Sequence, residues 1–106
     1  MPHLVGRLLG LLAQLVLPLA VVASCGTPPP IATASDAARA NVALADLEHG
    51  RSFLISKCGA CHVPPLPASQ KPSDWPRQVD AMAERAKITA EQHHLIVQYL
   101  VTMTIH

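Results

Sequence analysis

Two cysteines and a histidine stand close together near the middle of the chain, in the order Cys58-Gly59-Ala60-Cys61-His62. A thiol can form a disulfide, bind a metal or be converted to a thioether, and an imidazole nitrogen can bind iron. The C-x-x-C-H pattern is the attachment signature of c-type haem. At this spacing both sulfurs reach vinyl groups of one porphyrin, and the next residue is carried to the iron. We therefore expect Cys58 and Cys61 to hold one haem covalently and His62 to be its proximal iron ligand.

Two other uses of a C-x-x-C motif compete with haem attachment. Half of a zinc site would need two further ligands, and the adjacent His93 and His94 cannot easily both turn to one ion. A dithiol redox motif is expected beside a βαβ pattern, and no alternating strand pattern occurs in this sequence. Haem attachment is favoured, and zinc or thiol chemistry is the alternative.

The composition excludes several other functions. The 106 residues contain eight Lys and Arg against seven Asp and Glu, so there is no basic field for nucleic acid. The sequence also shows neither paired carboxylates nor an activated nucleophile, which favours a carrier over an enzyme, with no small-molecule substrate. With one Phe, one Trp and one Tyr, the protein part of the core is thin. A small domain of this kind suits a core completed by a large flat cofactor.

The first residues have the layout of an export signal. Arg7 precedes an apolar run over residues 8–23, and small residues then lead to Cys25. The run is shorter than the about 20 residues that a membrane-spanning helix needs. Residues 22–25 (VASC) resemble the lipobox of bacterial lipoproteins. The alternative is an ordinary signal followed by a structural cysteine.

The lipobox resemblance implies removal of residues 1–24 and acylation of Cys25, which would anchor the protein to a membrane. Gly26 follows the cysteine where inner-membrane retention usually needs Asp, so the resemblance favours the periplasmic side of the outer membrane. Residues 25–34 contain three consecutive prolines and no charge, and we expect the acylated Cys and an extended tether there. Residues 35–106 are then the haem domain.

Helical periodicity dominates the rest of the chain. A first helix is expected to begin at Ser35 or Asp36 and to be interrupted at Gly50, with a second short helical piece leading into Cys58. The apolar face of the first helix contains Ala40, Leu44 and Leu47.

Two more helices are expected after an irregular, proline-rich loop over residues 63–75. Residues 73–76 (SDWP) are typical of a helix start, and Thr89 to Gln92 fits a capping box that begins the last helix. The apolar stripe of the last helix contains Leu95, Ile96, Tyr99, Leu100 and Met103. The sequence thus predicts an all-α domain of three to four helices.

Residues 50–58 (GRSFLISKC) look like the N-terminal helix of small class I cytochromes c, in which a glycine, two apolar residues and a lysine precede the first haem cysteine. In that family the glycine lets the first helix cross closely over an aromatic–Leu pair in the last helix, and Tyr99-Leu100 matches this pair. The resemblance covers residues 48–62 and 89–100, and the middle is shorter than in familiar members. It implies a periplasmic monohaem cytochrome that passes single electrons from a redox protein donor to an acceptor.

The family's usual sixth iron ligand is a methionine before the last helix, and Met82 precedes Tyr99 at a suitable interval. Its thioether would raise the reduction potential relative to ligation by two nitrogens. Met103 is the fallback, and the competing interpretation makes Met82 a core residue. Other candidates are His49, His93 and His94. An open or weakly held sixth position would instead give a module that binds a small ligand, and an incidental motif would leave a structural lipoprotein.

Three further contacts are expected around the haem. Trp75 packs on the ring, bonds a propionate through its indole nitrogen, or serves only structural packing in the core. Arg77 either pairs with a propionate or lies on a solvated helix face. A carbonyl within residues 63–67 is expected to accept the free N–H of His62 and so to fix the orientation of its ring.

Overall fold

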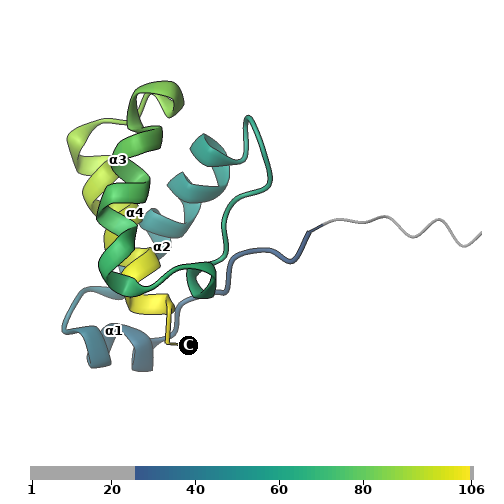
Figure 1. Ribbon diagram of the computed structural model, residues 1–106. Coiled ribbons are helices and arrows are strands. Elements are labelled where there is room, and N and C mark those ends of the chain that lie inside the picture. Colours follow the sequence, from purple (N-terminus) through teal and green to yellow (C-terminus); the bar gives the residue numbers. More distant parts are fainter. Residues whose placement is uncertain (1–25, 106) are drawn as a thin grey trace, which may run out of the picture.

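A computed structural model describes residues 26–105, so the expected signal over residues 1–24 and the expected acylation site at Cys25 lie outside the described residues. Within residues 26–105 the fold is all-helical, as expected, and contains no strand (Figure 1). The four α-helices are α1 (Ala34–Ala40), α2 (Leu44–Phe53), α3 (Trp75–Ala86) and α4 (Ala90–Met103). No helix formed by residues 26–105 combines the length and the apolar character that a bilayer span requires.

Helix α4 is the element on which the others pack, since it contacts α1, α2 and α3. Its expected capping box is present, with the Thr89 side chain and Gln92 satisfying each other's backbone N–H groups. The expected apolar stripe of α4 is buried throughout. Around it the core contains Leu47, Leu54, Trp75, Val79, Ile96, Tyr99, Leu100 and Met103. Full burial of a leucine or methionine side chain contributes about 1.5–3 kcal/mol relative to exposure.

The first helix ends earlier than the sequence predicts, and the expectation that Gly50 interrupts it is wrong. The break falls at Asn41, whose left-handed backbone (φ 54°) ends α1. Asparagine tolerates this conformation better than most residues. Gly50 instead lies within α2 and is buried. Glycine is needed there, because a Cβ atom at this position would overlap the Leu95 carbonyl of α4.

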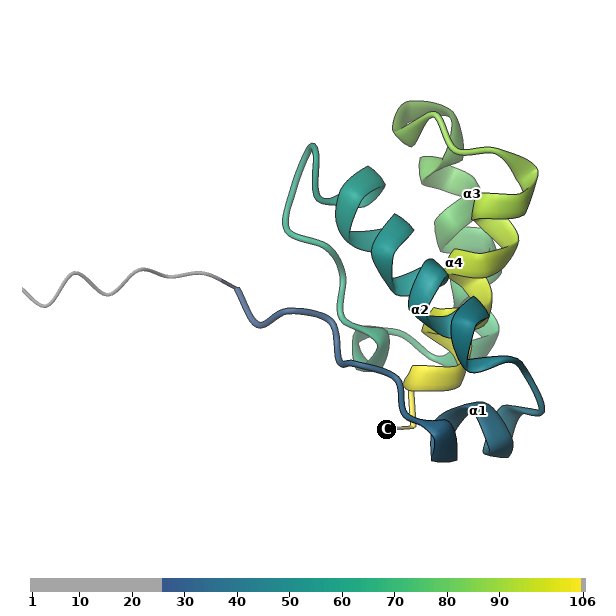
Figure 2. The same cartoon turned by 180° about the vertical axis from the view of Figure 1, so that it is seen from behind.

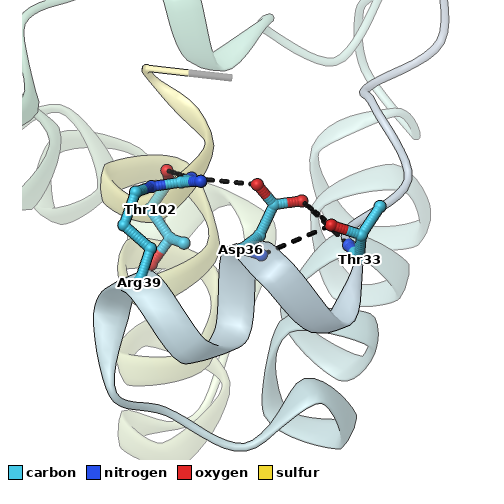
Figure 3. Close-up of polar contacts among 4 residues, drawn as sticks. All are labelled: Thr33, Asp36, Arg39 and Thr102. Atoms are coloured by element: carbon cyan, nitrogen blue, oxygen red, sulfur yellow. Dashed lines mark hydrogen bonds and ion pairs between the residues drawn. The ribbon is translucent and has the colours of Figure 1, made fainter.

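Helix α1 lies across the C-terminal end of α4 and is fixed there by a buried carboxylate (Figures 1, 2 and 3). Thr33, rather than Ser35 or Asp36, is the N-cap, and Asp36 accepts a hydrogen bond from the Thr33 backbone at 2.8 Å. Asp36 also pairs with Arg39 at 2.9 Å, and Arg39 donates to the Thr102 carbonyl at 3.2 Å. These contacts fasten the short α1 to the bundle.

Residues 26–33, which we call the strap, run without helix or strand along the domain toward α1 (Figure 2). We expected a free tether here, but Pro29 and Ala32 are buried. The Arg51 side chain donates to the Pro29 carbonyl at 2.9 Å, and the Tyr99 hydroxyl donates to the Pro30 carbonyl. Prolines have no N–H to satisfy, so residues 28–30 of the strap need partners only for their carbonyl groups. From Pro29 onward the strap is part of the folded domain.

Candidate functional site

The two motif cysteines lie at the end of the helical segment that continues from α2. After Phe53 the backbone continues as a π-helical turn, Leu54–Cys58, and the chain then turns through Gly59 into His62. Turns of this kind often occur at functional sites. Leu54 is buried beneath the turn, so the core holds the backbone that carries Cys58.

A cleft separates this motif from α3, and the structure brings five predicted site residues to it, which are Cys58, Cys61, His62, Trp75 and Met82. One part of the cleft is lined by Lys57, Cys58, Cys61, His62, Met82, Arg85 and Ala86. A second part shares Cys58, His62 and Met82 with the first, and extends inward to Leu54 and Leu100. The predicted proximal ligand His62 and the predicted distal ligand Met82 therefore line the same cleft, from two different segments of the chain.

Met82 does not belong to the buried core. Its side chain is 40% exposed, although its neighbours along α3, Trp75 and Val79, are buried. The competing interpretation of Met82 as a core residue is therefore wrong. An exposed thioether beside two thiols and an imidazole is a soft donor available to a metal.

The ring of His62 is held by its own loop. Its Nδ1 lies 2.9 Å from the carbonyl oxygen of Val63. A carbonyl oxygen only accepts, so Nδ1 carries the proton and Nε2 keeps its lone pair free to bind a metal. The expectation that a carbonyl within residues 63–67 fixes this ring is confirmed, and Val63 supplies it.

Cys58 and Cys61 are both free thiols. Burial, and to a smaller degree the neighbouring Cys61, raises the pKa of the half-buried Cys58 thiol. Reactive redox dithiols instead need a lowered thiol pKa, so the structure gives no support to thiol exchange.

Zinc binding also lacks support in the described part of the chain. Residues 26–105 contain no group of three or more His, Cys, Asp or Glu side chains that could hold a metal ion by themselves. His93, one of the histidines considered as a zinc ligand, lies beside Asp80 at 2.6 Å, in a contact between α4 and α3.

Trp75 lines the inner part of the cleft but has no free polar group. Its indole nitrogen donates to the Pro67 carbonyl at 3.1 Å and lies 3.3 Å from the Thr104 hydroxyl. The indole is 3% exposed, and it ties the proline-rich loop to the end of α4. Of the three expected roles, structural packing fits this arrangement and packing on a ligand in the cleft is compatible with it, whereas bonding to a propionate is not.

Two predicted residues are not brought to the cleft. The Arg77 side chain is 79% exposed and lies 3.6 Å from Asp74, so it belongs to the solvated face of α3. Met103 is 1% exposed in the core, and it lines neither part of the cleft. The fallback assignment of Met103 as an iron ligand therefore has no geometric support.

Two cations that line the cleft, Lys57 and Arg85, were not predicted as site residues, although the resemblance included a lysine before the first haem cysteine. Arg85 lies three residues after Met82, on the same face of α3, so helical spacing from Met82 could have revealed it. Either cation can pair with a carboxylate of a bound ligand.

No protein-family model matches this chain. No curated protein matches its sequence, and no solved structure matches its fold. The residues of the cleft are therefore the basis for assigning a function.

Proposed function

We propose that this chain is a monohaem c-type cytochrome that carries single electrons on the periplasmic side of a bacterial membrane. The observation that carries this proposal is the common cleft of the C-x-x-C-H motif and Met82. The two cysteines of the motif would attach the haem covalently. The cleft adds apolar lining residues and, from Met82, a thioether that can bind the iron in addition to His62.

The residues present fit a covalently held haem. Cys58 and Cys61 are free to form thioethers, His62 has Nε2 free, and Met82 offers a sulfur from α3. The iron of a bound haem supplies a one-electron redox couple. Burial of the porphyrin against Leu54, Trp75, Val79 and Leu100 would remove apolar surface from water and stabilise the domain.

The chain's own residues then set the properties of the carrier. The Val63 carbonyl keeps the His62 ring in one orientation, which limits rearrangement around the metal. A thioether from Met82 is a neutral ligand and raises the potential relative to a second nitrogen. If His62 and Met82 both held the iron, no position would be left for a substrate, so we propose a carrier between a redox protein donor and an acceptor. Acyl chains on Cys25 would hold it on the membrane, with the outer membrane favoured over the inner.

Covalent haem is tested by expressing the full chain in a host that matures c-type cytochromes. We expect a coloured protein whose haem stays with the chain in denaturing electrophoresis and stains for peroxidase activity. The double variant Cys58→Ser, Cys61→Ser should lose the stain. His93→Gln, a histidine outside the cleft, should keep it. A colourless wild-type chain, with the mass of polypeptide and lipid alone, would refute the proposal in favour of a structural lipoprotein.

The 40% exposure of Met82 favours a second candidate function, a haem module that binds a small gas or anion in place of a weakly held sulfur. Addition of carbon monoxide to the reduced protein separates the two. An electron carrier with firmly held Met82 should keep its visible spectrum. A binding module should show a new spectrum that saturates with the gas.

A further inference from the structure

The strap fixes where the chain leaves the domain. Arg51 and Tyr99 bind the carbonyl groups of Pro29 and Pro30, so these residues cannot swing freely. Upstream, Gly26 lies against Val63. A Cβ atom built on Gly26 would lie only 3.0 Å from a methyl carbon of Val63. Consecutive Cα atoms are about 3.8 Å apart, so Cys25 begins one peptide bond from this contact.

Exposed apolar side chains flank this exit point. Val63 is 66% exposed, and Ile55 and Leu66 are each 37% exposed. Ile55 and Val63 line a groove with the first residues of the strap, and Leu66 lines a second groove with Thr27 and Pro28. We call Ile55, Val63 and Leu66 the exit patch.

The chain around the exit patch contains cations and lacks carboxylates. Between Arg51 and Ser73 the sequence has Lys57 and Lys71 but no Asp or Glu, and the strap has no charged residue. A chain segment with this charge balance is compatible with anionic phospholipid headgroups, which attract basic segments.

We propose that the exit patch lies directly on a phospholipid surface, so that the anchor orients the domain instead of letting it rotate at the end of a tether. The proposal rests on the proposed acylation of Cys25. Acyl chains that begin one residue before Gly26 bring lipid to Val63, and insertion of Val63, Ile55 and Leu66 then buries exposed apolar surface. Val63 directly follows His62, so this orientation holds the C-x-x-C-H motif beside the membrane.

The test places a photoreactive benzophenone amino acid at Val63 or, as the matched control, at Ile105. The two side chains are almost equally exposed, at 66% and 68%, but Ile105 lies in a groove with α1 residues and not with the strap. Full-length acylated holoprotein is reconstituted in vesicles of phosphatidylethanolamine and phosphatidylglycerol and irradiated. Intact mass then measures phospholipid adducts. We expect at least five-fold more adduct at Val63 than at Ile105, and equal yields would overturn the proposal.

A second variant checks that the strap is responsible. Arg51→Ala removes the bond to the Pro29 carbonyl, and we expect the preference for Val63 over Ile105 to fall at least two-fold. An unchanged preference would contradict orientation by the strap. The same mass spectra report haem and acyl chains. If the protein carries haem and acyl chains but labels equally at the two positions, only the orientation is refuted. If it lacks the acyl mass, orientation and anchoring are refuted together. If it lacks haem, the proposed redox function is refuted.

Discussion

Gly50 of α2 lies so close to Leu95 of α4 that a Cβ atom on Gly50 would overlap the Leu95 carbonyl oxygen and lie 2.8 Å from the Cβ of Tyr99. The two helices can therefore cross at this point only if one residue has no side chain. The crossing sets the direction of α2, and the direction of α2 places Cys58 opposite α3.

Replacement Gly50→Ala should destabilise the protein by about 1–3 kcal/mol, because the added methyl group forces the two backbones apart. Chemical denaturation of the holoprotein measures this change. Ser52→Ala, at an exposed position of the same helix, should change the free energy of unfolding by no more than about 0.5 kcal/mol. Equal effects of the two variants would contradict the close crossing.

Replacement Met82→Ala should change the visible spectrum to that of an iron without a thioether ligand, and the reduction potential should fall. The stability of the haem-free chain should change little, because Met82 is 40% exposed there. Met103→Leu is the control, since Met103 is buried in the core and a swap of similar volume costs less than about 1.5 kcal/mol. Its spectrum should match wild type. A wild-type spectrum in Met82→Ala would refute the assignment of the sixth ligand.

High pH should loosen the strap through Tyr99. Burial raises the pKa of Tyr99 from 10.0 to about 12, although the charge and hydrogen bond of Arg51 lower it. Below pH 10 both states are protonated, and above it the unfolded chain loses its proton first. The free energy of unfolding should therefore fall between pH 10 and pH 12, by roughly 2 kcal/mol.

Tyr99 is the only tyrosine in the chain, so tyrosinate absorbance reports this titration directly. Tyr99→Phe should remove this part of the pH dependence while other groups still titrate. A tyrosinate signal with a midpoint near pH 10 in the folded protein would show that the hydroxyl is not buried against the strap.

Helix α3 ends at Lys87, which has a left-handed backbone with φ 53°. Glycine adopts this conformation without the steric cost that a Cβ atom adds. Lys87→Gly should therefore raise the free energy of unfolding by about 0.5–1 kcal/mol. Asn41→Gly, at the left-handed end of α1, should gain less because asparagine tolerates the conformation. Thermal unfolding measures both, and a larger gain at Asn41 would contradict this reasoning.

The parts of the fold that sequence predicted correctly depend on local chemistry. The capping box at Thr89 and the stripe of α4 follow from side chains within one or two turns of each other. For Gly50 the local pattern predicted a helix break, whereas the resemblance to class I cytochromes c predicted a close crossing over Tyr99-Leu100. The structure contradicts the break and bears out the close crossing, at Leu95 and Tyr99. The break at Asn41 was missed because the local pattern assigned it to Gly50.

The candidate site divides in the same way. The motif residues were predicted from their spacing, the loop carbonyl for His62 from the usual partner of a metal-bound histidine, and Met82 from the interval that the resemblance to class I cytochromes c implies. The partner of the Trp75 indole could not, because Pro67 reaches it only through the path of the loop. The strap was interpreted as a free tether for a similar reason, since its partners Arg51 and Tyr99 lie 22 and 69 residues further along the chain.

Helix α4 follows the other helices in chain order and contacts all of them. Although α1 and α2 also contact each other, the main packing surface of α2 and α3 is therefore absent until residues 90–103 have been synthesised. If the chain is matured as proposed, the thiols of Cys58 and Cys61 should remain accessible to a maturation enzyme during this interval. A chain cut short before α4 should stay expanded and be sensitive to proteases.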